Sequence, residues 1–97
     1  MNSNGEKEYR IERFDESRIG DLEKLYAAVY KKKSPPSYFL KKYDTAYTGI
    51  SYIGYIAYKE NLPIAFYGVI PCFIQYENRL ILSAQSADTM THPGHRY

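Results

Sequence analysis

The spacing of apolar residues changes near the middle of this chain, from the period of a helix to the period of a strand. Residues 1–48 hold 10 Lys or Arg and 8 Asp or Glu, whereas residues 49–97 hold only 3 and 3. A charged first half suits helices with a solvated face, and a nearly uncharged second half suits strands with at least one buried face. We therefore expect helices first and a sheet after them.

The first half predicts one strand and two helices. Residues 9–14 alternate apolar and charged side chains, as a strand with one buried face does. Asp15 is expected to cap the first helix, with Ser17 as the competing candidate. Ser34 is expected to cap the second helix, with Pro35 at its first position. The apolar stripes of the two helices are expected to be Ile19, Leu22, Leu25, Tyr26 and Val29 in the first, and Phe39, Leu40 and Tyr43 in the second.

The second half predicts three consecutive strands. They are expected over residues 52–59, 64–76 and 80–91, where Tyr, Ile and other strand-forming residues gather between turn-forming clusters. Short turns between successive strands imply an antiparallel meander. Pro71 has no amide hydrogen to give to a sheet, so we expect a bulge there or a nitrogen that faces an unpaired edge.

Together these elements predict an α+β fold: a strand, two helices, then a three-stranded antiparallel meander. The four strands are expected to form a mixed or antiparallel sheet that carries both helices. Because 97 residues leave room for a single core, we expect residues 1–97 to form one domain, with residues 1–8 disordered.

Composition argues against several classes of function. The net charge of +2 is too small by itself to indicate a nucleic-acid partner or an anionic membrane, and no apolar run approaches the ~20 residues of a membrane span. The polar start of the chain does not resemble a signal peptide. A lone cysteine, Cys72, indicates a reducing cytoplasm, and with the two histidines it matches no zinc-site spacing. We expect no metal, nucleic acid or membrane partner.

The last eleven residues carry the sharpest motif. Residues 87–91 are small or apolar except for Asp88, and they lead into His-Pro-Gly-His-Arg at 92–96. This segment resembles the x-H-P-x-x-R element of the GNAT superfamily of N-acetyltransferases. The order of the preceding elements is similar to the first half of that family's fold. The chain is therefore expected to be the N-terminal half of a GNAT domain, ending at the start of the pyrophosphate-binding loop.

The resemblance implies transfer of an acetyl group from acetyl-coenzyme A to a primary amine on a small molecule, an amino sugar or a protein terminus. It implies that the backbone of Met90 and Thr91 binds the pantetheine arm, and that Arg96 and Tyr97 open the loop that holds the pyrophosphate. Asp88 would accept the proton of the acceptor amine, commonly through water. Because the family's later elements do not follow Tyr97, we expect the 97-residue chain alone to be inactive.

Each candidate residue also has a structural alternative. Asp88 could be no more than a carboxylate hydrogen-bonded at the end of a sheet. His92 and His95 are possible proton carriers, but we expect His92 to be structural. Cys72 is expected to be a buried, inert thiol, and the lysines at 31–33 a solvated helix end rather than a phosphate site. Five tyrosines are expected to form a half-buried face of the sheet rather than to stack on nucleic-acid bases: Tyr52, Tyr55, Tyr58, Tyr67 and Tyr76.

Two rival functions remain open. The first is a non-catalytic interaction module, because a sheet whose last strand lacks a neighbour presents an edge that favours pairing with a second chain. That hypothesis predicts a homodimer formed through an exposed sheet edge. The second is an RNA-binding α+β domain, which would show a salt-sensitive affinity for oligonucleotides.

Overall fold

The computed structural model describes residues 9–95, and it confirms the predicted α+β fold. Residues 1–8, expected to be disordered, and Arg96 and Tyr97 lie outside the described residues. The elements, in chain order, are β1 (Tyr9–Arg13), the 3₁₀ turn η2 (Glu16–Arg18), α1 (Ile19–Tyr30), α2 (Tyr38–Tyr43), η3 (Ala46–Thr48), β2 (Ile53–Lys59), β3 (Leu62–Tyr76), β4 (Arg79–Thr91) and η4 (Pro93–His95).

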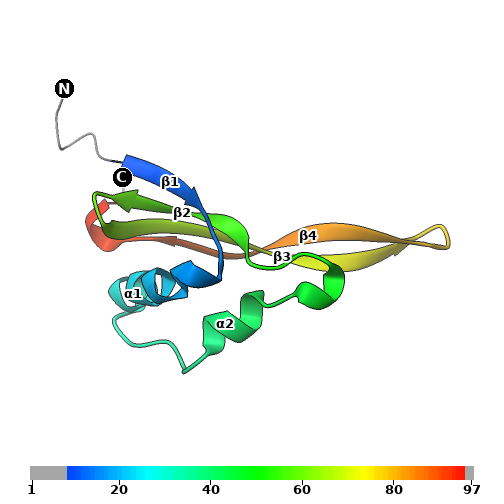
Figure 1. Ribbon diagram of the computed structural model, residues 1–97, viewed down its shortest axis with the longest axis horizontal. Helices are drawn as coiled ribbons and strands as arrows, with labels where there is room; N and C mark the ends of the chain where they lie inside the picture. Colours follow the sequence, from blue (N-terminus) through cyan, green and yellow to red (C-terminus); the bar gives the residue numbers. More distant parts are fainter. Residues whose placement is uncertain (1–8, 96–97) are drawn as a thin grey trace.

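The sheet is wholly antiparallel, with the strand order β1-β2-β3-β4 (Figure 1). Each strand lies next to its neighbour in sequence, even though both helices come between β1 and β2. The β3–β4 ladder is the longest and runs from Ala65 opposite Thr91 to Tyr76 opposite Arg79. Within the described part of the chain β4 has a strand on one side only, which makes it an edge strand.

Both helices cover the same face of the sheet, and the core lies between the two layers (Figure 1). The predicted stripe of α1 is confirmed, because Leu22 and Leu25 are buried and its other members pack against the core. In α2 Leu40 is exposed, so its predicted place in the stripe is wrong. Apolar burial is the main favourable contribution to folding, at roughly 1.5–3 kcal/mol for each large side chain. The buried cluster consists of Phe14, Leu22, Leu25, Phe39, Tyr43, Ile56, Tyr58, Phe66 and Met90.

The helix starts differ from those predicted. Asp15 does act as a cap, since its Oδ1 accepts the Ser17 amide at 2.9 Å, but it caps η2, the turn that precedes α1. The second predicted start is wrong. Pro36 disfavours the helical conformation in the residue before it, so Pro35 does not open a helix. Instead the Pro35 carbonyl accepts the Tyr38 amide at 3.1 Å, and α2 begins at that tyrosine.

Of the two alternatives expected for Pro71, a bulge or a nitrogen that faces an unpaired edge, the bulge is not found. Pro71 lies in register opposite Ala84, and the nearest shift in the β3–β4 ladder lies between Gly68 and Val69. The pairing of β2 with β3 ends at Val69, so Pro71 lies where β3 has β4 as its one neighbour. A proline there costs the sheet no hydrogen bond if its nitrogen faces the unpaired side.

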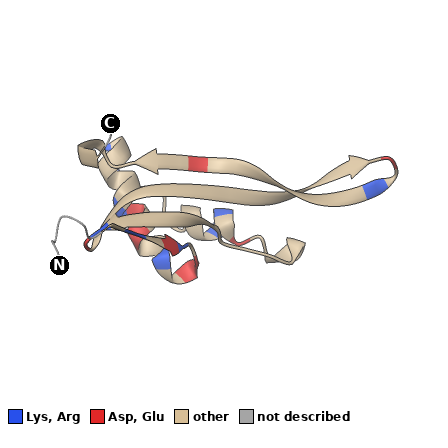
Figure 2. Ribbon diagram, turned by 90° about the horizontal axis from the view of Figure 1, so that it is seen from above, with Lys and Arg blue, Asp and Glu red and all other residues tan. Residues whose placement is uncertain are grey.

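Beyond the pair of Ile53, the first residue of β2, with Val69, the β3–β4 hairpin continues alone as a two-stranded arm, residues 70–85 (Figure 1). The arm projects from the layered body, and the molecule with its arm measures 54 × 32 × 25 Å. It is covered by neither helix in either view (Figures 1 and 2).

A glycine at position 68 is needed for the packing of α2 against the sheet. A Cβ added to Gly68 would collide with the Tyr43 hydroxyl and the Phe66 ring. We expect Gly68→Ala to lower the free energy of unfolding by about 1–3 kcal/mol, measured by urea denaturation. Gly20→Ala is the matched control, because outside the neighbouring backbone of its own helix no atom lies within 4 Å of the added methyl group. Equal stability of the two variants would contradict this packing.

Candidate functional site at the end of β4

Asp88 directs its carboxylate toward the helices, where α2 supplies two partners. Tyr43 Oη donates a hydrogen bond to Asp88 Oδ2 at 2.5 Å, and Lys42 Nζ lies 2.9 Å from the same oxygen. The Asp88 side chain is still 20% exposed. Asp88 is therefore hydrogen-bonded, as a carboxylate with a purely structural role would be. It is also accessible to solvent or to a bound molecule.

Tyr43 is held in place by the core. Its ring packs edge-on against Phe14 and Phe66, with centroid distances of 5.4 and 5.7 Å. Burial of the hydroxyl and its hydrogen bond to Asp88 raise the pKa of Tyr43 well above the usual range. Tyr43 thus remains a neutral donor to the carboxylate.

Lys42 forms the charged contact at this site. Burial favours its neutral amine, but hydrogen bonds to Asp88 and Tyr38 outweigh burial, so the pKa of Lys42 is raised. The ammonium donates to Tyr38 Oη at 3.3 Å and lies 5.3 Å from the centre of that ring. Sequence reasoning missed both Lys42 and Tyr43 as partners of Asp88, because nothing local to α2 indicates which strand it meets.

A β-bulge lies directly before Asp88. Asp88 is opposite Gly68 and Ser86 is opposite Val69, which leaves Ala87 as the extra residue on β4. Ala87 packs against the core, while Asp88, the next residue, contacts α2. Bulges re-aim side chains in this way, and here two consecutive residues turn toward the helix-bearing face.

Met90 and Thr91 continue β4 beyond the bulge, opposite Phe66 and Ala65. Met90 is buried in the core, with 4% of the residue exposed. On the face away from the helices, the same end of the strand borders a hollow of about 240 Å³. Its lining residues are Ile11, Tyr55, Ala57, Ala65, Phe66, Tyr67, Thr89, Met90 and Thr91.

His92 shapes the turn that follows β4. Its backbone amide donates to the Ile64 carbonyl at 2.7 Å, and its Nδ1 accepts the Gly94 amide at 3.0 Å. The His95 amide donates to the His92 carbonyl at 2.9 Å, which closes the short turn η4. These contacts engage the imidazole in local structure. Arg96 and Tyr97, the expected start of the phosphate loop, lie outside the described residues.

Two expectations about single side chains are wrong. Cys72 is partly exposed rather than buried, because it lies in the arm beyond β2. The five tyrosines also fail to share one face. Tyr58 is buried and donates to Asp21 Oδ2 at 2.6 Å, whereas Tyr55 and Tyr67 are about half exposed on the opposite face. Tyr76 is exposed in the arm, and Tyr52 packs at the margin of the core.

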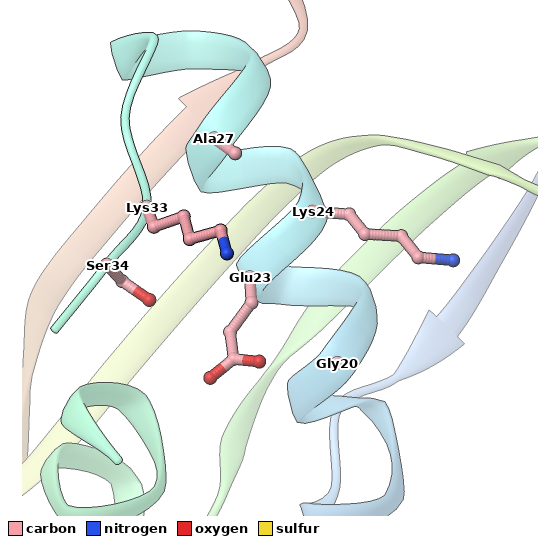
Figure 3. Close-up of a pocket in the computed structure, with 6 residues that line it drawn as sticks. All are labelled: Gly20, Glu23, Lys24, Ala27, Lys33 and Ser34. Atoms are coloured by element: carbon pink, nitrogen blue, oxygen red, sulfur yellow. The ribbon is translucent and has the colours of Figure 1, made fainter. Parts of the chain in front are cut away.

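A larger hollow, of about 460 Å³, lies beside α1 and belongs to a different part of the fold (Figure 3). Lys33 lines it together with Glu23 and Lys24, so its charges are mixed in sign. Lys31 and Lys32 are not among its lining residues. Gly20, Ala27 and Ser34 complete the lining.

Across positions 9–95 no group of His, Cys, Asp and Glu is placed to hold a metal ion. No helix in that range is both long and apolar enough to cross a membrane. Comparisons with protein-family models, with curated proteins and with solved structures find no match to this chain.

The raised pKa of Tyr43 predicts resistance to alkaline titration. Because the folded pKa lies above the ordinary value of 10.0, the stabilisation is complete below that value and is lost as the pH rises through the folded pKa. We expect the ¹³Cζ resonance of Tyr43 to keep the shift of a neutral phenol at about pH 11, while the protein stays folded. The Tyr43→Phe variant identifies the resonance. A titration midpoint near the ordinary value would contradict this account.

Replacement of Asp88 should destabilise the fold by separating α2 from β4. Asp88→Asn keeps an acceptor for Tyr43 but removes the charge that faces Lys42, and we expect a loss of about 1–2 kcal/mol in the free energy of unfolding. Asp44→Asn is the control, since Asp44 is exposed at the end of α2, and we expect a change within about 0.5 kcal/mol. Equal losses in urea titrations would show that the Asp88 contacts do not stabilise the fold.

Proposed function

We propose that this chain belongs to the GNAT superfamily and that its fold binds acetyl-coenzyme A for transfer of the acetyl group to a primary amine. The proposal is supported by the His-Pro-x-x-Arg element and by the order of strands and helices. One observation carries it furthest. β4 reaches that element as an edge strand, with a bulge and a reachable carboxylate directly before the exposed edge.

Under this proposal the pantetheine arm binds along the outer edge of β4. The arm is an extended chain with amide groups, so it can add to a sheet edge through backbone hydrogen bonds as a further strand would. The resemblance assigns this contact to the backbone of Met90 and Thr91. The pyrophosphate would then lie near Arg96 and Tyr97, an assignment that rests on the resemblance alone.

The proposed reaction begins at Asp88. An acceptor amine is mostly protonated near neutral pH and must lose a proton before it can attack. Asp88 accepts this proton through a water molecule, while Tyr43 and Lys42 hold the carboxylate in place. The amine nitrogen then bonds to the thioester carbon, the carbon–sulfur bond breaks, and the leaving thiolate takes up the second proton that the nitrogen loses as the amide forms. A small-molecule, amino-sugar or protein-terminal amine satisfies this chemistry, and a cytoplasmic location stays a prediction from composition.

The direct test is to titrate the isotopically labelled chain with acetyl-coenzyme A and follow its amide resonances. We expect shifts at Met90 and Thr91 when the ligand carries pantetheine, because its amides would meet the strand edge. Adenosine diphosphate is the control ligand and should leave these two resonances unchanged. The absence of any shift over residues 88–91 at millimolar acetyl-coenzyme A would overturn the proposal. A salt-sensitive response to oligonucleotides instead would favour the RNA-binding rival.

A further inference from the structure

The β3–β4 arm carries apolar side chains on both of its faces. Leu80, Ile81 and Leu82 are consecutive on β4, so they point alternately to the two faces, and all three are exposed. Phe73 and Ile74 repeat this pattern on β3, where they lie opposite Leu82 and Ile81. A strand that is apolar on both faces is typical of a sheet covered on both sides.

The outer edge of β4 in the arm has none of the usual protection against pairing. Native sheets protect exposed edges with charged residues, prolines or short strands. The charged residues of the hairpin tip are Glu77 and Arg79, and from there to Asp88 the strand carries no charge (Figure 2). Pro71 lies on the other strand of the arm, which leaves β4 the more suitable edge for pairing.

We propose that β4 pairs antiparallel with β4 of a second copy of this chain, across a two-fold axis at Ile81. In this register Ile81 lies opposite Ile81 of the second copy, and Leu80 lies opposite its Leu82. The cross-strand pair of Ile74 with Ile81 then extends into an unbroken apolar row through both copies. Arg79 faces Ser83 of the second copy, so no like charges meet.

The arm exposes apolar side chains on both of its strands, next to the edge that would pair. The neutrality of the strand favours a second copy over a charged partner such as a nucleic acid. The side chains that contribute this surface are Phe73, Ile74, Tyr76, Leu80, Ile81 and Leu82.

The proposed dimer contact leaves the candidate site open, because the dimer contact and the site lie on different parts of β4. Pairing around Ile81 lies on the tip side of the Ala87 bulge, and Asp88 and Met90 lie on the other side. A dimer therefore neither requires nor prevents the binding of acetyl-coenzyme A. The failure of one proposal is distinguishable from the failure of the other.

Sedimentation equilibrium from low micromolar to submillimolar protein tests the dimer. We expect the unaltered chain to approach twice the monomer mass, and Ile81→Lys to weaken self-association at least tenfold, because two ammonium groups would face each other at the axis. Ile50→Lys is the matched control. Ile50 is as exposed as Ile81, at 40%, but it precedes β2 and should leave association unchanged. A monomeric unaltered chain, an open-ended series of larger species, or an undiminished Ile81→Lys dimer would overturn the proposal.

Disulfide cross-linking tests the same dimer without the Ile81→Lys variant, in case that variant does not fold. In a Cys72→Ser background, Ile81→Cys should form a disulfide-linked dimer on mild oxidation, because the axis brings the two side chains within bonding distance. Ile50→Cys in the same background is the control for random collision. Equal cross-linking of the two variants would contradict the proposed register.

Discussion

The side chain of Tyr43 connects the apolar core to the polar end of β4. Its ring is fixed by Phe14 and Phe66, and its hydroxyl donates to Asp88. This contact requires the absence of a side chain at Gly68, directly opposite Asp88 in the β3–β4 ladder. The position of the carboxylate is therefore a consequence of core packing, and a change in the core would alter the candidate site.

The Ala87 bulge divides β4 into two parts with different surroundings. On one side the strand crosses the body of the sheet, where its inner face meets the core and α2. On the other side it belongs to a ribbon of two strands with exposed apolar faces. A two-stranded ribbon is marginal by itself in water, so the arm gains most from further pairing. One edge strand can thus present a ligand-binding end and a self-association surface.

The fold could be predicted from the sequence because its signals are local. The change from helical to strand period gave the element order, and the short turns gave the meander. Details set by neighbouring residues or distant strands could not be read in the same way. Pro36 prevented a helix start at Pro35, and Pro71 is tolerated because β2 begins only at Ile53, opposite Val69. In the candidate site, Asp88 was predicted, but its contacts with Lys42 and Tyr43 depend on a long-range register.

Amide hydrogen exchange along β4 tests the central claim most directly. The account predicts that amides over residues 88–90 that point away from β3 exchange quickly in the free protein and become protected when acetyl-coenzyme A binds. It predicts no such ligand-dependent change over residues 79–86, on the far side of the bulge. Slow exchange of every amide from 88 to 90 in the free protein, or no added protection with the ligand, would contradict the account.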